Sequence, residues 1–166
     1  MLKKNNMHMK ALGKLGLLVI IFGWVVFAKA QDCYYFHEYQ CKFPDNTYYL
    51  NGQSRSALFT YGMTSQFKMV TFGGEDYHIS ICYQFKIKNV RFRLIEDNED
   101  KTVLFDNAEN KYVTEVSFSN NVARRIIIEI SVPDEPTAKD RGVPQCVGVL
   151  IHSRKTYQEP KNKLGF

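Results

Sequence analysis

The sequence predicts an all-β protein, a two-sheet antiparallel β-sandwich of jelly-roll or Greek-key type with about eight strands. Three observations lead to this prediction. Short runs alternate apolar and polar side chains, polar turn residues separate these runs, and no segment after residue 30 shows a sustained helical apolar stripe. Short strands at regular spacing with polar turns are typical of sandwiches and small barrels.

The alternation is clearest in the run that contains Val90, Phe92 and Leu94 on one face and Arg91 and Arg93 on the other. Side chains at every second position share a face of a strand, so such a run has one face for a core and one for solvent. The predicted strands are Ser56–Tyr61, Gln66–Phe72, Tyr77–Gln84, Lys88–Ile95, Thr102–Phe105, Lys111–Phe118, Arg124–Val132 and Cys146–His152.

A long connection precedes the last predicted strand. Residues 133–144 (PDEPTAKDRGVP) contain three prolines and mixed charges, which favour a loop. A crossover of this length that returns the final strand to the middle of a sheet is typical of a Greek key. The domain is therefore expected to span residues 31–152, and the polar residues 153–166 are expected to form a tail.

The first 30 residues predict a cleaved signal peptide. A lysine-rich start precedes the apolar run Leu15–Phe27, and cleavage is expected between Ala30 and Gln31. The apolar run is shorter than the roughly 20 residues that span a bilayer, although an uncleaved anchor stays an alternative. Asp32 before Cys33 does not fit a lipoprotein signal. We expect a secreted or periplasmic protein, not a lipoprotein, with no stable membrane insertion after cleavage.

The charge balance changes once the leader is removed. The whole chain has 22 Lys and Arg residues against 17 Asp and Glu residues. Five of the lysines, and no acid, lie in the first 30 residues, so the remainder has equal numbers of basic and acidic residues. Nucleic-acid binding depends on uncompensated basic surface, and we therefore expect no nucleic-acid partner.

Four cysteines, Cys33, Cys41, Cys82 and Cys146, follow the leader. An even number in an exported chain predicts two disulfides, with three pairings allowed. The expected pairs are Cys33 with Cys41, within a loop over residues 31–55, and Cys82 with Cys146, on two strands. The alternative is a metal site in the spacing Cys-x3-His-x3-Cys around His37, but structural zinc sites usually need four ligands. No metal or cofactor is expected.

Several segments resemble a group of small, exported, functionally uncharacterised bacterial β-sandwich proteins. These segments are GQSRSALF (52–59), GMTSQFKMV (62–70), GGEDYHISIC (73–82), LFDNAENKY (104–112), IIIEISVP (126–133) and CVGVLI (146–151). The strand order is also similar, at the level of the fold only, to the jelly-roll accessory domains of secreted peptidases. The resemblance implies an exported β-sandwich and assigns no catalytic residue.

The sequence shows no convincing catalytic motif. Ser54 and Ser56 can be drawn into a triad with His37, His78 or His152, yet no G-x-S-x-G elbow is present. Disulfides would also occupy every thiol that a Cys–His enzyme needs. We therefore expect no enzyme activity, and a hydrolase stays the weakest alternative.

Aromatic residues are concentrated just after the leader, and they suggest two roles. Tyr48 and Tyr49, together with Arg91 and Arg93, are candidates for a partner surface, because tyrosine combines an apolar face with a polar tip. The competing interpretations are that the rings seal a loop over one end of the sandwich and that the arginines form cross-strand ion pairs. The expected function is a non-catalytic protein-interaction or assembly module of the bacterial envelope. The alternative is a carbohydrate- or peptide-binding accessory domain, so the partner is an unknown envelope protein or a glycan.

Overall fold

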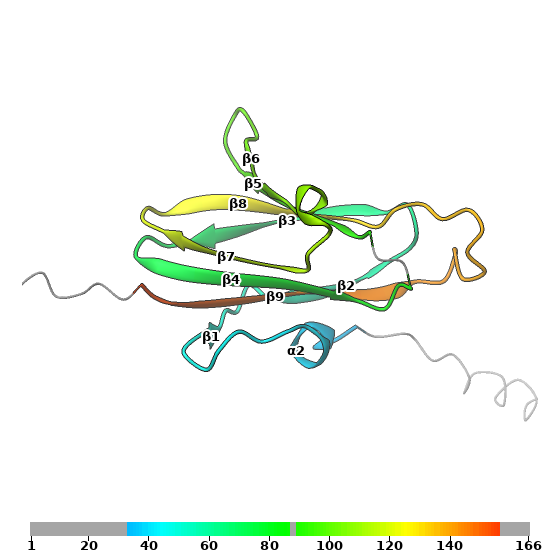
Figure 1. Cartoon of the computed structure of the whole chain (residues 1–166), viewed down its shortest axis with the longest axis horizontal. Helices are drawn as coiled ribbons and strands as arrows, with labels where there is room; N and C mark the ends of the chain where they lie inside the picture. The colour runs from blue at the N-terminus through cyan, green and yellow to red at the C-terminus, as the bar shows by residue number, and fades with distance from the viewer. Residues whose placement is uncertain (1–32, 87–88, 157–166) are drawn as a thin grey trace, which may run out of the picture. The chain divides into compact units, whose positions relative to one another are not determined.

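The computed structural model describes residues 33–86 and 89–156, which form one β-sandwich (Figure 1). The predicted cleavage point between Ala30 and Gln31 lies outside the described residues, as do residues 157–166 of the predicted tail. No helix in the described ranges is long and apolar enough to cross a membrane.

Nine strands are present in the described part of the chain, and each of the eight predicted runs corresponds to one of them. The strands are β1 (Tyr49–Leu50), β2 (Arg55–Phe59), β3 (Thr64–Thr71), β4 (Glu75–Tyr83), β5 (Arg91–Glu96), β6 (Val103–Asp106), β7 (Glu115–Asn120), β8 (Arg124–Ser131) and β9 (Gln145–Lys155). Two short helices accompany them, α2 (Phe36–Gln40) and the 3-10 helix η1 (Asn107–Asn110). The all-β prediction is confirmed.

Three differences from the predicted strands have a clear physical reason. β1 is additional, and its two residues are too few for a visible alternation. β7 begins at Glu115 rather than at residue 111, because Lys111 and Tyr112 both have positive φ and form a turn. β9 continues to Lys155, where it still pairs with β4. Residues 153–155 therefore belong to the strand, although their polar side chains predict a tail.

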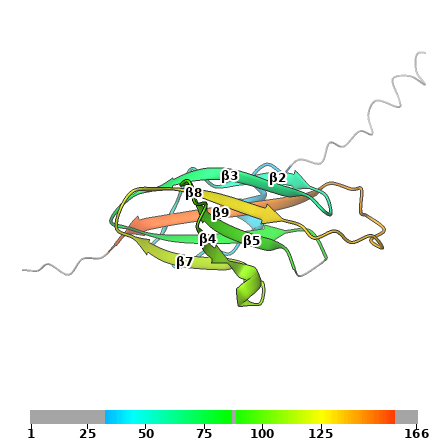
Figure 2. The same ribbon diagram turned by 90° about the horizontal axis from the view of Figure 1, so that it is seen from above.

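The strands form two antiparallel sheets packed face to face (Figures 1 and 2). Sheet A has the order β1-β9-β4-β7, with β2 also pairing with β9, and sheet B has the order β3-β8-β5-β6. β9 follows the 133–144 connection and lies between β4 and the two strands β1 and β2. This placement agrees with the predicted crossover to the middle of a sheet.

The core lies between the sheets and is built from the alternating apolar positions. Tyr77 and Ile79 of β4 and Phe92 of β5 are completely buried there. Burying one such side chain contributes on the order of 1.5–3 kcal/mol, so these alternating positions supply most of the apolar driving force for folding. The other buried core residues are Phe59, Tyr61, Met69, Ile81, Phe85, Val90, Leu94, Ile126, Ile128, Ile130, Val132, Val147, Val149 and Ile151.

The outer face of sheet A is buried over β4 and β9, because residues 33–50 reach across it: residues 33–48 lie on this face as a third layer and lead into β1, which pairs with β9 in the sheet itself (Figure 1). We call residues 33–50 the N-terminal segment. Leu150 of β9 is completely buried although it points away from the core shared with sheet B. The sequence predicted a loop over one end of the sandwich. The structure corrects this: α2 contacts β9, β4 and β2 on the face of the sheet.

Two disulfides attach the N-terminal segment to sheet A, and the predicted pairing was wrong. The bonds are Cys33–Cys146 and Cys41–Cys82, and no described cysteine is free. Cys82 and Cys146 do share the outer face of neighbouring strands, but Cys82 lies opposite Gly148 rather than opposite Cys146. This two-residue offset keeps Cys82 and Cys146 apart. Each of them instead forms a disulfide with a cysteine of the N-terminal segment.

The first prediction concerns this pairing. Peptide mapping without reduction should recover Cys33 linked to Cys146 and Cys41 linked to Cys82, and denaturant should expose no reactive thiol. Closing loops of 113 and 41 residues contributes about 5 and about 4 kcal/mol in the chain-entropy estimate. Urea unfolding of the two paired Cys→Ser variants should therefore show large losses for both. A recovered Cys33–Cys41 peptide would contradict the structure.

Candidate functional site

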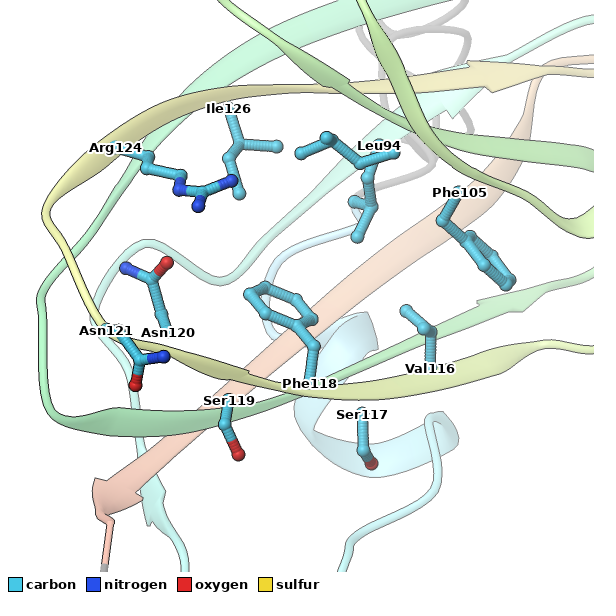
Figure 3. Close-up of a pocket in the computed structure, with 11 residues that line it drawn as sticks. Leu94, Phe105, Val116, Ser117, Phe118, Ser119, Asn120, Asn121, Arg124 and Ile126 are labelled. Carbon is cyan, nitrogen blue, oxygen red and sulfur yellow. The ribbon is translucent and has the colours of Figure 1, made fainter.

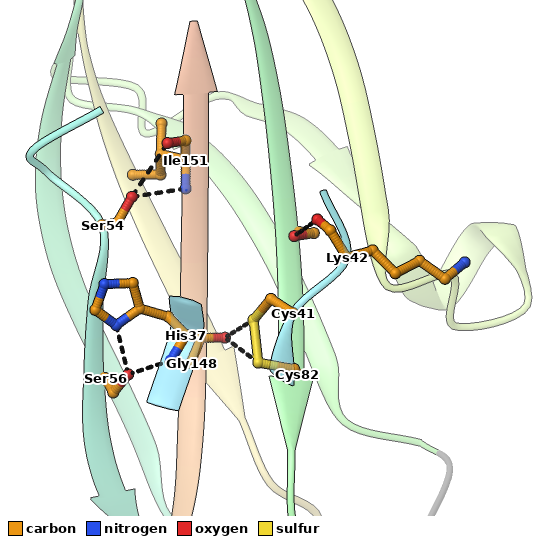
Figure 4. Close-up of a disulfide and its surroundings, with 9 residues drawn as sticks. His37, Cys41, Lys42, Ser54, Ser56, Cys82, Gly148 and Ile151 are labelled. Carbon is orange, nitrogen blue, oxygen red and sulfur yellow. Dashed lines mark hydrogen bonds between the residues drawn. A yellow bond between two sulfur atoms is a disulfide. The ribbon is translucent and has the colours of Figure 1, made fainter. Parts of the chain in front are cut away.

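Helix α2 packs directly against β9 at Gly148, where the two backbones approach closely (Figure 4). A Cβ atom at Gly148 would lie 2.8 Å from the backbone Cα of His37 and 2.9 Å from the sulfur of Cys82. No larger residue would leave room for the helix and the disulfide together. The sulfur atoms of Cys41 and Cys82 lie 3.5 and 4.0 Å from the Gly148 carbonyl oxygen.

Polar contacts position the same helix over β2. The backbone N–H of His37 donates to Ser56 Oγ at 2.9 Å, and His37 Nδ1 lies 2.7 Å from the same oxygen. Ser54 bridges β2 to β9: its hydroxyl donates to the Ile151 carbonyl at 3.1 Å and accepts from the Ile151 amide at 2.9 Å (Figure 4). Ser56 therefore supports the attachment of the N-terminal segment, whereas Ser54 joins the turn before β2 to β9.

Arg154, near the end of β9, joins the second half of the N-terminal segment to the sheet. Its guanidinium donates to Asp76 at 3.1 Å and to the Thr47 hydroxyl at 2.6 Å. It also lies 4.4 Å from the centre of the Tyr48 ring, a cation–π contact. Together with Asp45 at 3.8 Å, these contacts fix residues 45–48 against β9.

Two histidines lie beneath this part of the segment, side by side on β4 and β9. His78 and His152 are register partners and are 8% and 3% exposed. The Phe43 ring packs edge-on against His152, with centroids 5.2 Å apart, and the Tyr48 ring packs against His78 at 6.2 Å. His78 Nδ1 bonds to the Ser117 hydroxyl at 2.8 Å. His78 Nε2 and His152 Nδ1 are buried and make no hydrogen bond within the described part of the chain.

Burial lowers the pKa of both imidazoles, because the charged form loses its hydration. Around His78, the carboxylates of Glu115 and Asp45 partly oppose this lowering, whereas Lys42 adds to it. The pKa of His152 is lowered further by the neighbouring His78. Burial likewise lowers the pKa of His37, and Glu38 partly opposes it. Burial therefore favours the neutral form of all three imidazoles, His37 within the N-terminal segment and His78 and His152 beneath it.

The solvent side of the N-terminal segment carries exposed aromatic rings. Tyr34, Tyr39, Phe43 and Tyr49 are 71%, 78%, 61% and 75% exposed. We call these four residues the aromatic face. Large aromatic side chains are enriched at protein interfaces, so these four exposed residues are candidates for contact with a partner. The sequence also suggested that these rings seal the N-terminal loop. Phe43 and Tyr48 do pack on His152 and His78. The other three, Tyr34, Tyr39 and Tyr49, are exposed instead.

A groove of about 360 Å³ lies beside this face, between α2 and the turn that leads into β2. Leu50 and the Tyr34 and Tyr35 rings supply its apolar wall, while Glu38 and Arg55 supply opposite charges. The groove combines flat rings with hydrogen-bonding groups. Its complete lining is Cys33, Tyr34, Tyr35, His37, Glu38, Leu50, Asn51, Gly52, Ser54, Arg55 and Ser56.

The four residues predicted as a partner surface do not come together. Tyr49, in β1 at the end of the N-terminal segment, is exposed, whereas Tyr48 is partly buried between His78 and Arg154. Arg91 and Arg93 belong to β5 of the other sheet. Arg91 pairs with Asp106 and Arg93 with Glu129, with Nε–oxygen distances of 3.0 and 2.7 Å. These contacts confirm the expected ion pairs between neighbouring strands and lower the pKa of both carboxyl groups.

The candidates for chemistry are brought together only in part. Ser56 and His37 are in contact, but His37 Nε2 lies 3.7 Å from Glu38 Oε1, which is too long for the hydrogen bond that orients a catalytic histidine. His78 and His152 pair with each other, far along β9 from these two residues. Among the described residues, no group of three or more His, Cys, Asp or Glu side chains could hold a metal ion.

Sequence reasoning missed Gly148 and Arg154, although a signal for the third layer was present. Residues 145–152 of β9 (QCVGVLIH) are all buried. The run lacks the alternation of apolar and polar residues that a strand with one solvent-exposed face would show. Such a run is typical of a strand covered on both sides. The sequence did not show which segment covers it.

Comparisons with known proteins give little further information. No family model matches the chain, and no curated protein matches it. Among solved structures, the chain is similar to PliG of Aeromonas hydrophila, a periplasmic inhibitor of g-type lysozyme. The two are 13% identical, the TM-score is 0.39, and the alignment covers 66% of this chain and 91% of that one. The account of the site therefore depends on the residues of this chain.

The close approach at Gly148 leads to a second prediction. Gly148→Ala should lower the free energy of unfolding by about 1–3 kcal/mol, because the new methyl group overlaps backbone that two disulfides hold in place. Urea unfolding measures the change. Gly52→Ala is the matched control, since a Cβ there meets nothing within 4 Å. Equal stability of the two variants would show that α2 does not lie against β9.

The buried imidazoles lead to a third prediction, on pH. Their folded-state pKa lies below the unfolded value of about 6.5. Above pH 6.5 the histidines are neutral in both states and do not oppose folding. As the pH falls from 6.5 toward the lowered folded-state pKa values, only the unfolded state takes up protons, so the free energy of unfolding decreases. The urea midpoint should drop between pH 7 and pH 5. Acidic groups with lowered pKa, such as Asp45 and Asp76, lose their contribution only below about pH 4.

The double variant His78→Gln, His152→Gln should show a smaller decline over the same interval, with His37 responsible for what is left. A midpoint that does not change between pH 7 and pH 5 in the unmodified protein would contradict the burial of these rings.

Proposed function

We propose that the chain is an exported, non-catalytic module that binds a partner protein of the bacterial envelope through its aromatic face. The observation that carries the proposal is the set of four exposed rings on a segment attached to sheet A at both Cys33 and Cys41. The predicted leader over residues 1–30 is consistent with export. So are the two disulfides, since such bonds persist in oxidising compartments.

Rigidity makes the exposed rings suited to binding. Ordering a loop and its side chains costs about 0.5–1.5 kcal/mol per immobilised side chain when it happens during association. Here the disulfides, the Ser56 contact and the Arg154 contacts order the segment before a partner arrives. Tyrosine and phenylalanine are enriched in protein interfaces because a large flat ring loses little side-chain entropy. A preorganised aromatic surface is therefore the strongest argument for a protein partner.

The contacts of Ser56 and His37 support a non-catalytic role. Ser56 Oγ already accepts the His37 backbone N–H, and the His37 side chain is buried between α2 and the sheet that this bond joins. A nucleophilic serine needs a base that is itself oriented by a third group. The 3.7 Å separation between His37 and Glu38 does not supply that orientation.

The groove beside α2 favours one second candidate, a module that binds a carbohydrate or a short peptide. Its volume of about 360 Å³ falls in the range of small-ligand sites, roughly 300–1,000 Å³. Tyr34, Tyr35 and the side chains of Glu38 and Arg55 would provide stacking and hydrogen bonds. This site shares Tyr34 with the aromatic face, and its Leu50 wall follows Tyr49 directly in the chain.

A fourth prediction separates the candidates. A partner isolated from envelope extracts should bind the purified protein directly, and Tyr39→Ala with Tyr49→Ala should weaken that binding at least tenfold, as expected for truncated interface rings. Val122→Ala is the control, because Val122 is 55% exposed in the turn between β7 and β8 and does not belong to the N-terminal segment. Calorimetry or surface plasmon resonance measures the affinity.

Three outcomes would decide against this proposal. Binding that survives the double variant would remove the aromatic face from the interface. Saturable glycan binding that is lost on Tyr34→Ala would favour the groove instead. A hydrolytic activity that is abolished by both Ser56→Ala and His37→Gln, in variants that stay folded, would show that the protein is an enzyme.

A further inference from the structure

A second concave site lies on one side of the sandwich, between the edge strands of the two sheets. β7 ends sheet A and β6 ends sheet B. Between them is a cavity of about 380 Å³, which we call the lateral slot. Its lining is Leu94, Leu104, Phe105, Val116, Ser117, Phe118, Ser119, Asn120, Asn121, Arg124 and Ile126. The slot is formed without any residue of the N-terminal segment, so it is independent of the aromatic face.

The slot reaches the apolar core. Leu94 and Ile126, at its base, are 2% and 1% exposed, whereas Phe105, Val116 and Phe118 along its walls are only partly buried. Figure 3 shows Val116 and Phe118 directed from β7 toward Leu94 and Ile126, while Ser117 and Ser119 point away. From Val116 to Asn120 the slot follows four residues of strand, about 13 Å. It is a long, narrow and mainly apolar space.

Arg124 closes one end of the slot and is the one charged residue in its lining. Its side chain extends from the start of β8 into the space between Ile126 and Asn120 (Figure 3). The ion pair that it forms with Glu96 is long, at 3.9 Å, and Glu96 does not line the slot. The slot therefore combines an apolar body with a single positive charge at one end.

We propose that the lateral slot binds a single-chain amphiphile, with its alkyl chain between the sheets and an anionic head group at Arg124. The walls belong to both sheets, so the occupant has to enter between them. A peptide strand added to the free edge of β7 would stay in the plane of sheet A and would leave Leu94 and Ile126 uncovered. An alkyl chain fills such a space, and the removal of its apolar surface from water drives binding.

Dodecanoate, used below the concentration at which it forms micelles, is a suitable probe. Calorimetry should show one saturable site on the oxidised protein. Amide resonances of β7 and of residues 124–126 should shift in the NMR spectrum, while those of α2 should not. Dodecyltrimethylammonium, which has the same chain and a cationic head, should bind more weakly.

Two variants test the chain and the head group separately. Arg124→Gln should weaken dodecanoate about fivefold, the size of a partly exposed ion pair, and should leave the cationic amphiphile no weaker. Arg125→Gln is the matched control, because this neighbouring arginine is 71% exposed and pairs with Asp97 outside the slot. Val116→Phe should fill the slot and weaken the binding of both probes at least tenfold. A urea unfolding midpoint close to that of the unmodified protein shows that this variant is folded.

The proposal is overturned if dodecanoate does not bind, or if its resonance shifts fall on the N-terminal segment instead. Equal effects of Arg124→Gln and Arg125→Gln would remove the head-group assignment. An extended peptide that binds at β7 while dodecanoate does not would show that the edge recognises a strand. None of these outcomes depends on whether the aromatic face binds a protein.

Discussion

The attachment of the N-terminal segment to sheet A determines much of the rest of the structure. β9 is the central strand of that sheet, and both of its faces are apolar. Without a cover, Leu150 and the Cys146 region would be exposed to water. The segment supplies the cover through two disulfides and a close approach at Gly148. Because the cover is covalent, a short helix of five residues, which would be unstable alone, keeps a defined position.

The same attachment separates two surfaces with different chemistry. Over sheet A the segment turns large aromatic rings outward, which are held in place before any partner binds. On the side of the sandwich, the two sheets diverge at their edge strands and leave a slot to the core that Arg124 closes at one end. The outer face of sheet B differs from both, since its carboxylates and arginines neutralise each other in ion pairs. The two proposed binding surfaces therefore lie over sheet A and in the slot.

Local features of this structure could be predicted from the sequence, and contacts between distant segments could not. The period-two alternation identified each strand longer than two residues, and the proline-rich stretch identified the crossover to β9. The choice between cysteine partners depended on a two-residue offset between β4 and β9 that no local pattern encodes. The same holds for Tyr48 and Tyr49, which are adjacent in the chain: one packs on His78, and the other faces solvent.

The most direct test of this account is the contact between α2 and β9. A Cβ at Gly148 would lie 2.8 Å from the His37 Cα, so the Hα protons of His37 and Gly148 must be close neighbours. A nuclear Overhauser effect between them, in the oxidised protein at neutral pH, is the predicted result. Its absence, with both resonances assigned and the sandwich folded, would show that the N-terminal segment does not cover sheet A.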